Sequence, residues 1–432
     1  MNLLTDNINK IYRHYLIPAL GSSMVMSIYT LTDAVVVGKG VGADGLAALN
    51  LITPPYCLIM CLGLLFGIGG SVHTSVQKGL GNSDKANRYF TLSLMGLVVS
   101  ILAVWAGYVV WADEIMQLMG AKGILDVYAK EYMKYVNIFF PFMALSNFVA
   151  IYVRTDGNPN RAMFGVLGGG IVNVVLDIIL VFPVQMGIGG AALASMIGIC
   201  VQLCISGSHF LSRKNTLRLI VPRKIGISLG QIVGSGLSAF INELANGFIV
   251  CLFNVQILRY CGTTALSVYG VIANCVILFN SLFTGVGQAV QPIISTNYGA
   301  GKSDRISAMK KKGYTTVVMM GVIFAILGIA APLAITSVFL KVTPEIEAIA
   351  KNAVRIYFIA FIPMSINVFS CYYFQSVLKS KMSLLISTLR NIVISGVLLM
   401  AVPALLGGEA IWYVMVIDDC IVAAICLLCH KL

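Results

Sequence analysis

Charge is scarce in this sequence of 432 residues. Asp, Glu, Lys and Arg make up only 11% of it, whereas 58% of the residues are hydrophobic, and the mean hydropathy is +0.91. A soluble domain needs roughly a quarter of its residues charged, so this composition excludes a soluble globular fold. The chain also lacks a polar stretch long enough for a soluble nucleotide-binding domain, so we expect neither bound ATP nor an ATP-driven activity.

Clustered cysteines and histidines are lacking as well. The eleven cysteines are scattered through apolar blocks, which is typical of lipid-buried thiols and not of a disulfide framework. The four histidines fall in separate segments without the spacing of a zinc site. We therefore expect no cofactor and no metal centre, other than Na⁺ held by carboxyl groups.

Long apolar blocks dominate what remains. A bilayer core of roughly 30 Å takes about 20 apolar residues per helix, and the chain contains twelve blocks of that kind. The sequence therefore predicts an all-α integral membrane protein with twelve transmembrane helices. The predicted spans are 15–37, 46–75, 90–112, 126–153, 163–184, 188–211, 230–257, 264–293, 313–339, 352–377, 383–405 and 410–429.

The basic residues indicate how these helices are oriented. With the N-terminus placed in the cytoplasm, most of the 29 Lys and Arg residues fall in inner loops, as the positive-inside rule requires. Both termini are then cytoplasmic and the chain is a multi-pass protein of the cell or inner membrane. The net charge of +12 would face anionic lipid, so we expect membrane lipid and not nucleic acid as a partner.

An internal repeat divides the chain into two halves. GLGNSDKA at 79–86 and GAGKSDRI at 299–306 each follow a long apolar block and begin the next helix. Six predicted spans separate the two copies, so both lie on the same side of the membrane and the halves are related by a pseudo-two-fold axis. We predict an amino-terminal lobe over 1–215, a cytoplasmic linker over 216–225 and a carboxy-terminal lobe over 226–432.

Acidic residues inside the predicted spans are the first candidates for function, because a charge at the bilayer centre costs roughly 3 kcal/mol on insertion scales. Asp33, Asp177 and Glu243 lie in such positions. Tyr29 and Asn173 each precede one of these acids by one helical turn and share its helix face. Each pair could take up a proton or Na⁺, although hydrogen bonding across a helix interface is the alternative.

Two further acids, Asp418 and Asp419, lie in the last predicted span. Arg390 of the preceding span could pair with them. We interpret these three residues as a structural charge set.

At these residues the sequence resembles the multidrug and toxic compound extrusion (MATE) family over essentially its whole length. The resemblance rests on YTLTDAVVVGKGVGADGLAALNLITP at 29–54, on the two repeat motifs, and on NVVLDIILVFPVQMGIGGAALASM at 173–196. It implies two six-helix lobes around a central cavity that alternates between inward and outward openings. It also implies exchange of H⁺ or Na⁺ for an organic, often cationic, compound.

The resemblance also implies roles for individual residues. The positions that match the family's amino-lobe cation site are Tyr29, Asp33, Asn147, Asn173 and Asp177, with Ser195 where Thr is common in relatives. Glu243 is similar to the carboxy-lobe acid of some members. Those members also carry an Asp in the tenth span, and 352–377 has none, which leaves coupling through the second lobe in doubt and favours the amino lobe.

These observations predict a secondary active antiporter that exports small amphipathic compounds and functions as a monomer, not an enzyme. Candidate residues for an adaptable apolar substrate site are Met26, Phe142, Phe148, Tyr357 and Phe361. One alternative is a flippase for lipid-linked oligosaccharides, which would need basic residues within the spans to hold a pyrophosphate. Another is an intramembrane enzyme, but His73 and His209 have no acid at helical spacing to act with them.

Overall fold

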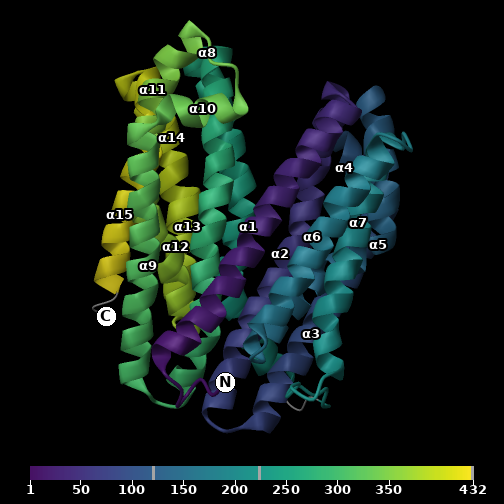
Figure 1. Ribbon diagram of the computed structural model, residues 1–432, viewed down its shortest axis with the longest axis vertical. Helices are drawn as coiled ribbons and strands as arrows, with labels where there is room; N and C mark the ends of the chain where they lie inside the picture. Colours follow the sequence, from purple (N-terminus) through teal and green to yellow (C-terminus); the bar gives the residue numbers. More distant parts are fainter. Residues whose placement is uncertain (119–121, 222–224, 430–432) are drawn as a thin grey trace. The chain divides into compact units, whose positions relative to one another are not determined.

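The computed structural model describes residues 1–118, 122–221 and 225–429, and within these ranges it contains helices and no strand (Figure 1). The first half comprises α1 (Ile8–Gly40), α2 (Ala43–Gly79), α3 (Ser83–Val110), α4 (Ala112–Leu118), α5 (Ile124–Thr155), α6 (Pro159–Val181), α7 (Gly187–Gly207) and the short η1 (Ser208–Leu211). The second half comprises α8 (Ile225–Gly299), α9 (Ser303–Ala330), α10 (Pro332–Phe339), α11 (Pro344–Ile359), α12 (Phe361–Ser376), α13 (Ser380–Thr388), η2 (Leu389–Ile394), α14 (Ser395–Leu406), η3 (Gly408–Tyr413) and α15 (Val414–Cys429).

The number of membrane crossings agrees with the prediction. Within the described ranges, eleven helical segments are long and apolar enough to span a bilayer. One of them belongs to α8, whose 75 residues would extend for about 110 Å as one straight helix. α8 is interrupted at Gly262, where φ is +82°, so it supplies two spans and brings the total to twelve. The all-helical fold class is confirmed.

The helix ends differ from the predicted boundaries. The block predicted over 313–339 is divided at Ala331 into α9 and α10, and α9 begins ten residues earlier, at Ser303. Pro332 starts α10, because proline has no N–H to continue the preceding helix. Hydropathy detects only the apolar centre of a span, so the predicted span lacks the polar first turns of α9.

The helices form two compact units. Unit 1 contains Met1–Phe240 together with Ser295–Lys302, and unit 2 contains Ile241–Ile294 together with Ser303–Leu432. α8 therefore contributes its first residues and its last turn to unit 1 and its middle to unit 2. The lobe boundaries over 1–215, 216–225 and 226–432 remain a prediction, and 222–224 of that linker lie outside the described residues.

Within unit 1, α6 and α7 pack at very close range. A methyl group placed on Gly169 would lie 2.6 Å from the carbonyl oxygen of Gly198, and one placed on Gly198 would lie 2.7 Å from that of Gly169. Small residues at such crossings let two backbones approach. The facing side chains of α6 and α7 are thereby held close together, including those of Asn173 and Ser195.

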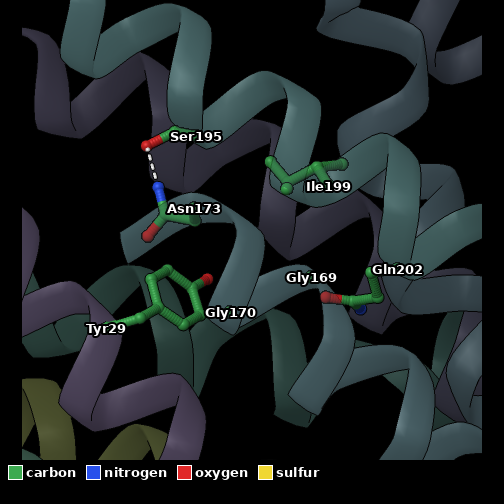
Figure 2. Close-up of a pocket in the computed structure, with 8 residues that line it drawn as sticks. Tyr29, Gly169, Gly170, Asn173, Ser195, Ile199 and Gln202 are labelled. Carbon is green, nitrogen blue, oxygen red and sulfur yellow. Dashed lines mark hydrogen bonds between the residues drawn. The ribbon is translucent and has the colours of Figure 1, made fainter. Parts of the chain in front are cut away.

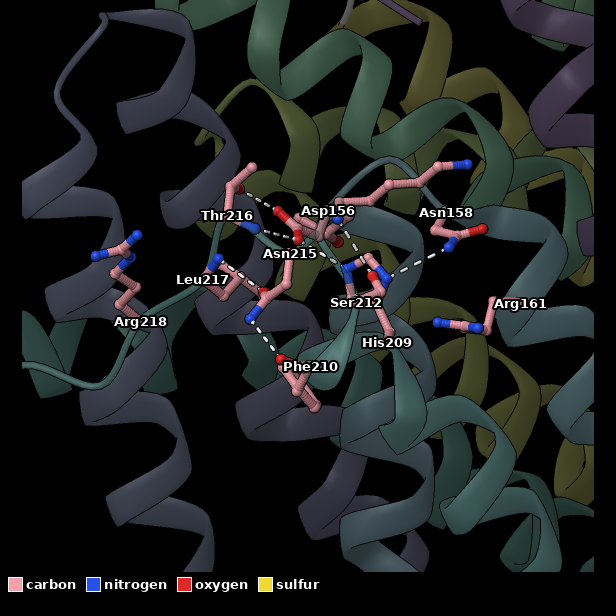
Figure 3. A network of polar contacts seen from close by, with 12 residues as sticks. Asp156, Asn158, Arg161, His209, Phe210, Ser212, Asn215, Thr216, Leu217 and Arg218 are labelled. Atoms are coloured by element: carbon pink, nitrogen blue, oxygen red, sulfur yellow. Dashed lines mark hydrogen bonds and ion pairs between the residues drawn. The ribbon is translucent and has the colours of Figure 1, made fainter.

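Unit 1 also contains a buried polar cluster around Asp156, which follows the last residue of α5 (Figure 3). Asp156 Oδ2 accepts hydrogen bonds from His209 Nε2 (2.8 Å) and from the backbone N–H of Thr216 (2.9 Å). Its Oδ1 contacts Lys78 of α2 and the Thr216 hydroxyl. Asn158 donates to the other ring nitrogen of His209 (3.3 Å). This Asp156 cluster joins α2, α5, η1 and the segment after η1.

The cluster changes the acidity of Asp156. Burial by itself would raise the pKa of this carboxyl, but the hydrogen bond from His209 and the positive charge of Lys78 lower the pKa below its usual value. A lowered pKa means that the folded protein favours the carboxylate. The contribution to stability is therefore complete above the pKa of the unfolded chain, about 4, and is lost as the pH falls through the folded-state value.

We predict that Asp156→Asn destabilises the protein, because it leaves Lys78 without its partner at a site where the Asp156 side chain is fully buried. Breaking a buried ion pair costs about 3 kcal/mol or more. Thermal unfolding of the purified protein in detergent should show a midpoint lower by several degrees at pH 7, and the difference should shrink below about pH 4.

Asp113→Asn is the matched control, since Asp113 pairs with Lys130 while its side chain is 69% exposed. Exposed pairs contribute little, so this variant should unfold with the wild type. Equal midpoints for Asp156→Asn and Asp113→Asn at pH 7 would contradict the assigned role of the cluster.

Candidate cation-binding site

Three neighbouring helices of unit 1 position the predicted amino-lobe residues. Tyr29 and Asp33 lie one turn apart on α1, and Asn173 and Asp177 lie one turn apart on α6. This spacing places each pair on one helix face, as predicted. Asp177 is fully buried and Asn173 is buried, whereas Asp33 and Tyr29 are half-buried. Ser195 faces them from α7.

One hydrogen bond joins α6 and α7 at this site: Asn173 Nδ2 donates to Ser195 Oγ at 3.1 Å (Figure 2). Four carboxyl and amide oxygens around it have no hydrogen-bond partner among the described residues. They are Asp33 Oδ1, Asn173 Oδ1 and both side-chain oxygens of Asp177. Buried polar atoms are normally satisfied, and an unsatisfied one costs several kcal/mol in an apolar environment. The arrangement therefore fits a site whose oxygens bind a proton or a cation.

The two acids also influence each other. The carboxyl groups of Asp33 and Asp177 lie close enough to interact electrostatically. Two adjacent carboxylates cannot both remain charged at low cost in an apolar site. Binding of a proton or a monovalent cation relieves that repulsion. The pair thus has the chemistry of a reversible cation site.

A buried tyrosine that the sequence did not indicate lies near the site. Tyr132 of α5 is buried and is close enough to Asp33 and Asp177 to interact with them electrostatically. No motif distinguished Tyr132 from the other tyrosines of its span, because its role depends on the rotation of α5 against α1 and α6. Only the tertiary structure reveals that rotation.

A small pocket lies between α1, α6 and α7, next to the hydrogen bond from Asn173 to Ser195 (Figure 2). Its lining residues are Tyr29, Gly169, Gly170, Asn173, Ser195, Gly198, Ile199 and Gln202. Glycines form part of its wall and leave the space open. The side chains of Tyr29, Asn173 and Gln202 border the same pocket. Gln202 was also absent from the predicted site, although it lies two turns after Ser195 on the same helix.

The roles predicted for Asn147 and Glu243 remain predictions. Asn147 of α5 donates to the sulfur of Met60 on α2 (2.9 Å). Glu243, in the first part of α8, belongs to unit 2, where its side chain is exposed. The structure therefore brings together Tyr29, Asp33, Asn173, Asp177 and Ser195.

The candidate substrate residues divide into two groups. Phe148, Tyr357 and Phe361 are buried and pack in aromatic clusters, Phe148 against Tyr152 and Phe361 against Phe279. Phe142 is 41% exposed and Met26 is half-buried. A role in substrate binding remains a prediction for all five.

Solved structures share the fold of this chain. An outward-facing multidrug resistance MATE family transporter of the MOP superfamily superposes with a TM-score of 0.91 at 20% identity, over 99% of this chain and 96% of the other. A point mutant of the Vibrio cholerae MATE transporter VcmN matches with a TM-score of 0.91 at 17% identity, over 98% and 96%. The chain therefore has the same fold as these structures.

The family follows from the sequence itself. The MatE family model matches residues 18–179 and 239–400, three quarters of the chain, so the chain belongs to the MatE family. The double match confirms the internal repeat. Among relatives, the multidrug export protein MepA of Staphylococcus saprophyticus is 26% identical over 72% of this chain and 70% of its own length. MepA of Staphylococcus haemolyticus is 26% identical over 74% and 70%.

The close α6–α7 contact predicts a substitution that distorts the site without touching its polar groups. In Gly198→Ala the new methyl group would lie 2.7 Å from Gly169 O and 2.9 Å from Asn173 Cβ. The helices must separate, at a cost of about 1–3 kcal/mol. We expect a lower thermal midpoint in detergent for this variant.

Gly207→Ala, at the last residue of α7, is the matched control because a methyl group there meets nothing within 4 Å. It should unfold at or above the wild-type temperature, since alanine is the better helix former. A Gly198→Ala variant as stable as Gly207→Ala would show that α6 and α7 are not in tight contact.

Proposed function

We propose that this protein is a secondary active antiporter that exports small amphipathic, cationic organic compounds in exchange for H⁺ or Na⁺. The observation that carries the proposal is the acidic pair Asp33 and Asp177, whose buried oxygens lack hydrogen-bond partners among the described residues. The relatives named as multidrug export proteins support export of organic compounds. We further propose that the protein lies in the cell membrane as a monomer with both termini in the cytoplasm.

The proposed coupling follows from charge. With the site empty, Asp33 and Asp177 repel each other and attract a cationic substrate into the same unit. Uptake of H⁺ or Na⁺ removes that repulsion and removes the attraction, so the substrate is released. Because binding energies are reciprocal, the cation and the substrate must each weaken the binding of the other.

Antiport also requires two conformations. The coupling cation must favour one state and the substrate the other, because a ligand shifts an equilibrium only through its different affinity for the two states. Asp33 lies on α1 and Asp177 on α6, so neutralisation of the pair changes the force between these helices. We propose that α1 repacks against α6 in the transition, with Asn173, Ser195 and Tyr132 orienting the carboxyl groups.

We predict that Asp33→Asn and Asp177→Asn abolish coupled transport, because an amide cannot take up a proton and carries no charge for Na⁺. The assay is efflux of a fluorescent cationic dye from proteoliposomes under an imposed pH gradient and, separately, a sodium gradient. Each variant should lose about tenfold or more of the gradient-driven rate, and the effective gradient names the coupling ion.

Glu345→Gln is the control, since Glu345 is exposed at the start of α11, and it should transport like the wild type. Wild-type rates in Asp33→Asn would exclude the proposed role of the acidic pair. Failure of the wild type to move dye under either gradient would exclude drug antiport and direct the search to lipid-linked substrates.

A further inference from the structure

A second group of buried charges lies in unit 2, among the helices coloured green to yellow in Figure 1. Arg390 Nε donates to Asp419 Oδ1 at 2.6 Å. Asn367 Nδ2 donates to the same oxygen at 2.9 Å and to the backbone carbonyl of Asp419 at 2.9 Å. Arg390 is 5% exposed and Asp419 is fully buried. The charge pairing predicted for Arg390 is therefore confirmed for Asp419.

Asp418 has no such partner. Its side chain is fully buried, and neither of its carboxyl oxygens has a hydrogen-bond partner in the part of the chain that the structure describes. Asp419 Oδ2 also lacks a hydrogen-bond partner among the described residues. Two buried carboxyl groups are thus adjacent in the sequence, and the guanidinium of Arg390 forms its ion pair, within the described part of the chain, with Asp419. A structural charge set explains Asp419 but leaves Asp418 unexplained.

Among the described residues of unit 2, Arg390 is the only buried Lys or Arg. The ionisable groups that face this cluster are Arg390 of η2, Tyr357 of α11, Cys371 of α12 and Cys426 of α15 itself. Two other elements packed against α15 carry exposed charges, Lys381 on α13 and Glu409 on η3, and α14 carries no ionisable side chain. A carboxylate at Asp418 would be an uncompensated buried charge, which costs several kcal/mol. A proton on Asp418 removes that cost.

We propose that Asp418, together with Asp419 and Arg390, forms a second proton-binding site, in unit 2, and that Asp418 carries one exchangeable proton. The donor set favours H⁺ over a metal ion. Three carboxyl oxygens of Asp418 and Asp419 lack a partner among the described residues, whereas hard metal cations take about six oxygen ligands. In addition, no group of three or more His, Cys, Asp or Glu side chains among the described residues is placed to hold a metal.

The cluster is linked to other helices of unit 2. Arg390 Nη1 donates to Asn391 Oδ1 (3.4 Å), and Asn391 Nδ2 donates to Asn242 Oδ1 on α8 (2.8 Å). Arg390 and Asn391 belong to η2, a π-helical turn, and such turns are frequent at functional sites. Loss of the proton from Asp418 would draw Arg390 from Asp419 toward Asp418. That movement would change the contact with α8 next to Glu243.

The first test measures the proton directly. Infrared spectra of the purified full-length protein in lipid would be recorded as a function of pH in the Asp33→Asn, Asp177→Asn background, which removes the two acids of the candidate cation-binding site in unit 1. We expect a carboxylic acid C=O band that titrates with pH and disappears in Asp418→Asn. Asp418→Glu should move this band and keep its titration, and it serves also if Asp418→Asn does not fold.

The second test measures stoichiometry and rests on the proposed antiport. With the membrane potential held at zero, a one-unit pH gradient balances about a tenfold dye gradient for each proton exchanged. Asp418→Asn in the otherwise wild-type protein should therefore lower the limiting dye gradient about tenfold, whereas Glu345→Gln should not change it.

An absent band, a band that does not titrate, or an unchanged limiting gradient in Asp418→Asn would overturn the proposal and leave Asp418 as a structural acid. The two tests separate its failure from that of the proposed function. If the wild type moves no dye, antiport is excluded, and the infrared titration still decides whether Asp418 binds an exchangeable proton.

Discussion

A carboxylate inside a bundle of apolar helices must either acquire a compensating partner or give up its charge, and this constraint governs the interior of both units. Asp419 follows the first course, because Arg390 and Asn367 bind it directly. Asp177 and Asp418 have no such partner among the described residues. The difference separates a stable ion pair from the groups that we propose to bind a proton or a cation.

The neutral groups around Asp177 depend on helix packing. Gly169 and Gly198 let α6 and α7 approach until their backbones meet, and this closeness is what allows the hydrogen bond from Asn173 to Ser195. With larger residues the two side chains would separate and the amide oxygen of Asn173 would move away from the carboxyl group one turn later. The polar surroundings of Asp177 thus depend on Gly169 and Gly198, which have no side chain that could bind a proton or a cation.

The sequence was sufficient for the fold and for part of the site. Apolar length reveals helices because the bilayer requires it, and Asp33 and Asp177 are conspicuous because charge is rare in such segments. Tyr29 and Asn173 follow from helical spacing alone. Tyr132 and Gln202 do not, since their places depend on how α5 and α7 rotate against their neighbours. For the same reason no spacing rule links His209 to Asp156, which lies 53 residues away.

The repeat makes the distribution of acids informative. The two segments that match the family model begin and end 221 residues apart, and at that offset Asp33 and Asp177 correspond to Asn254 and Leu398, so the second copy lacks both acids. Unit 2 instead carries its buried acids on α15, outside the matched segment, and pairs one of them with arginine. The candidate site of unit 1 has two acids, Asp33 and Asp177, with no arginine bound to either in the described residues, whereas the cluster on α15 has two acids and one bound arginine. If each site is neutral when its cations are bound, the site in unit 1 takes two positive charges and the cluster in unit 2 takes one. The two units would then bind different numbers of the cations whose gradient drives the protein.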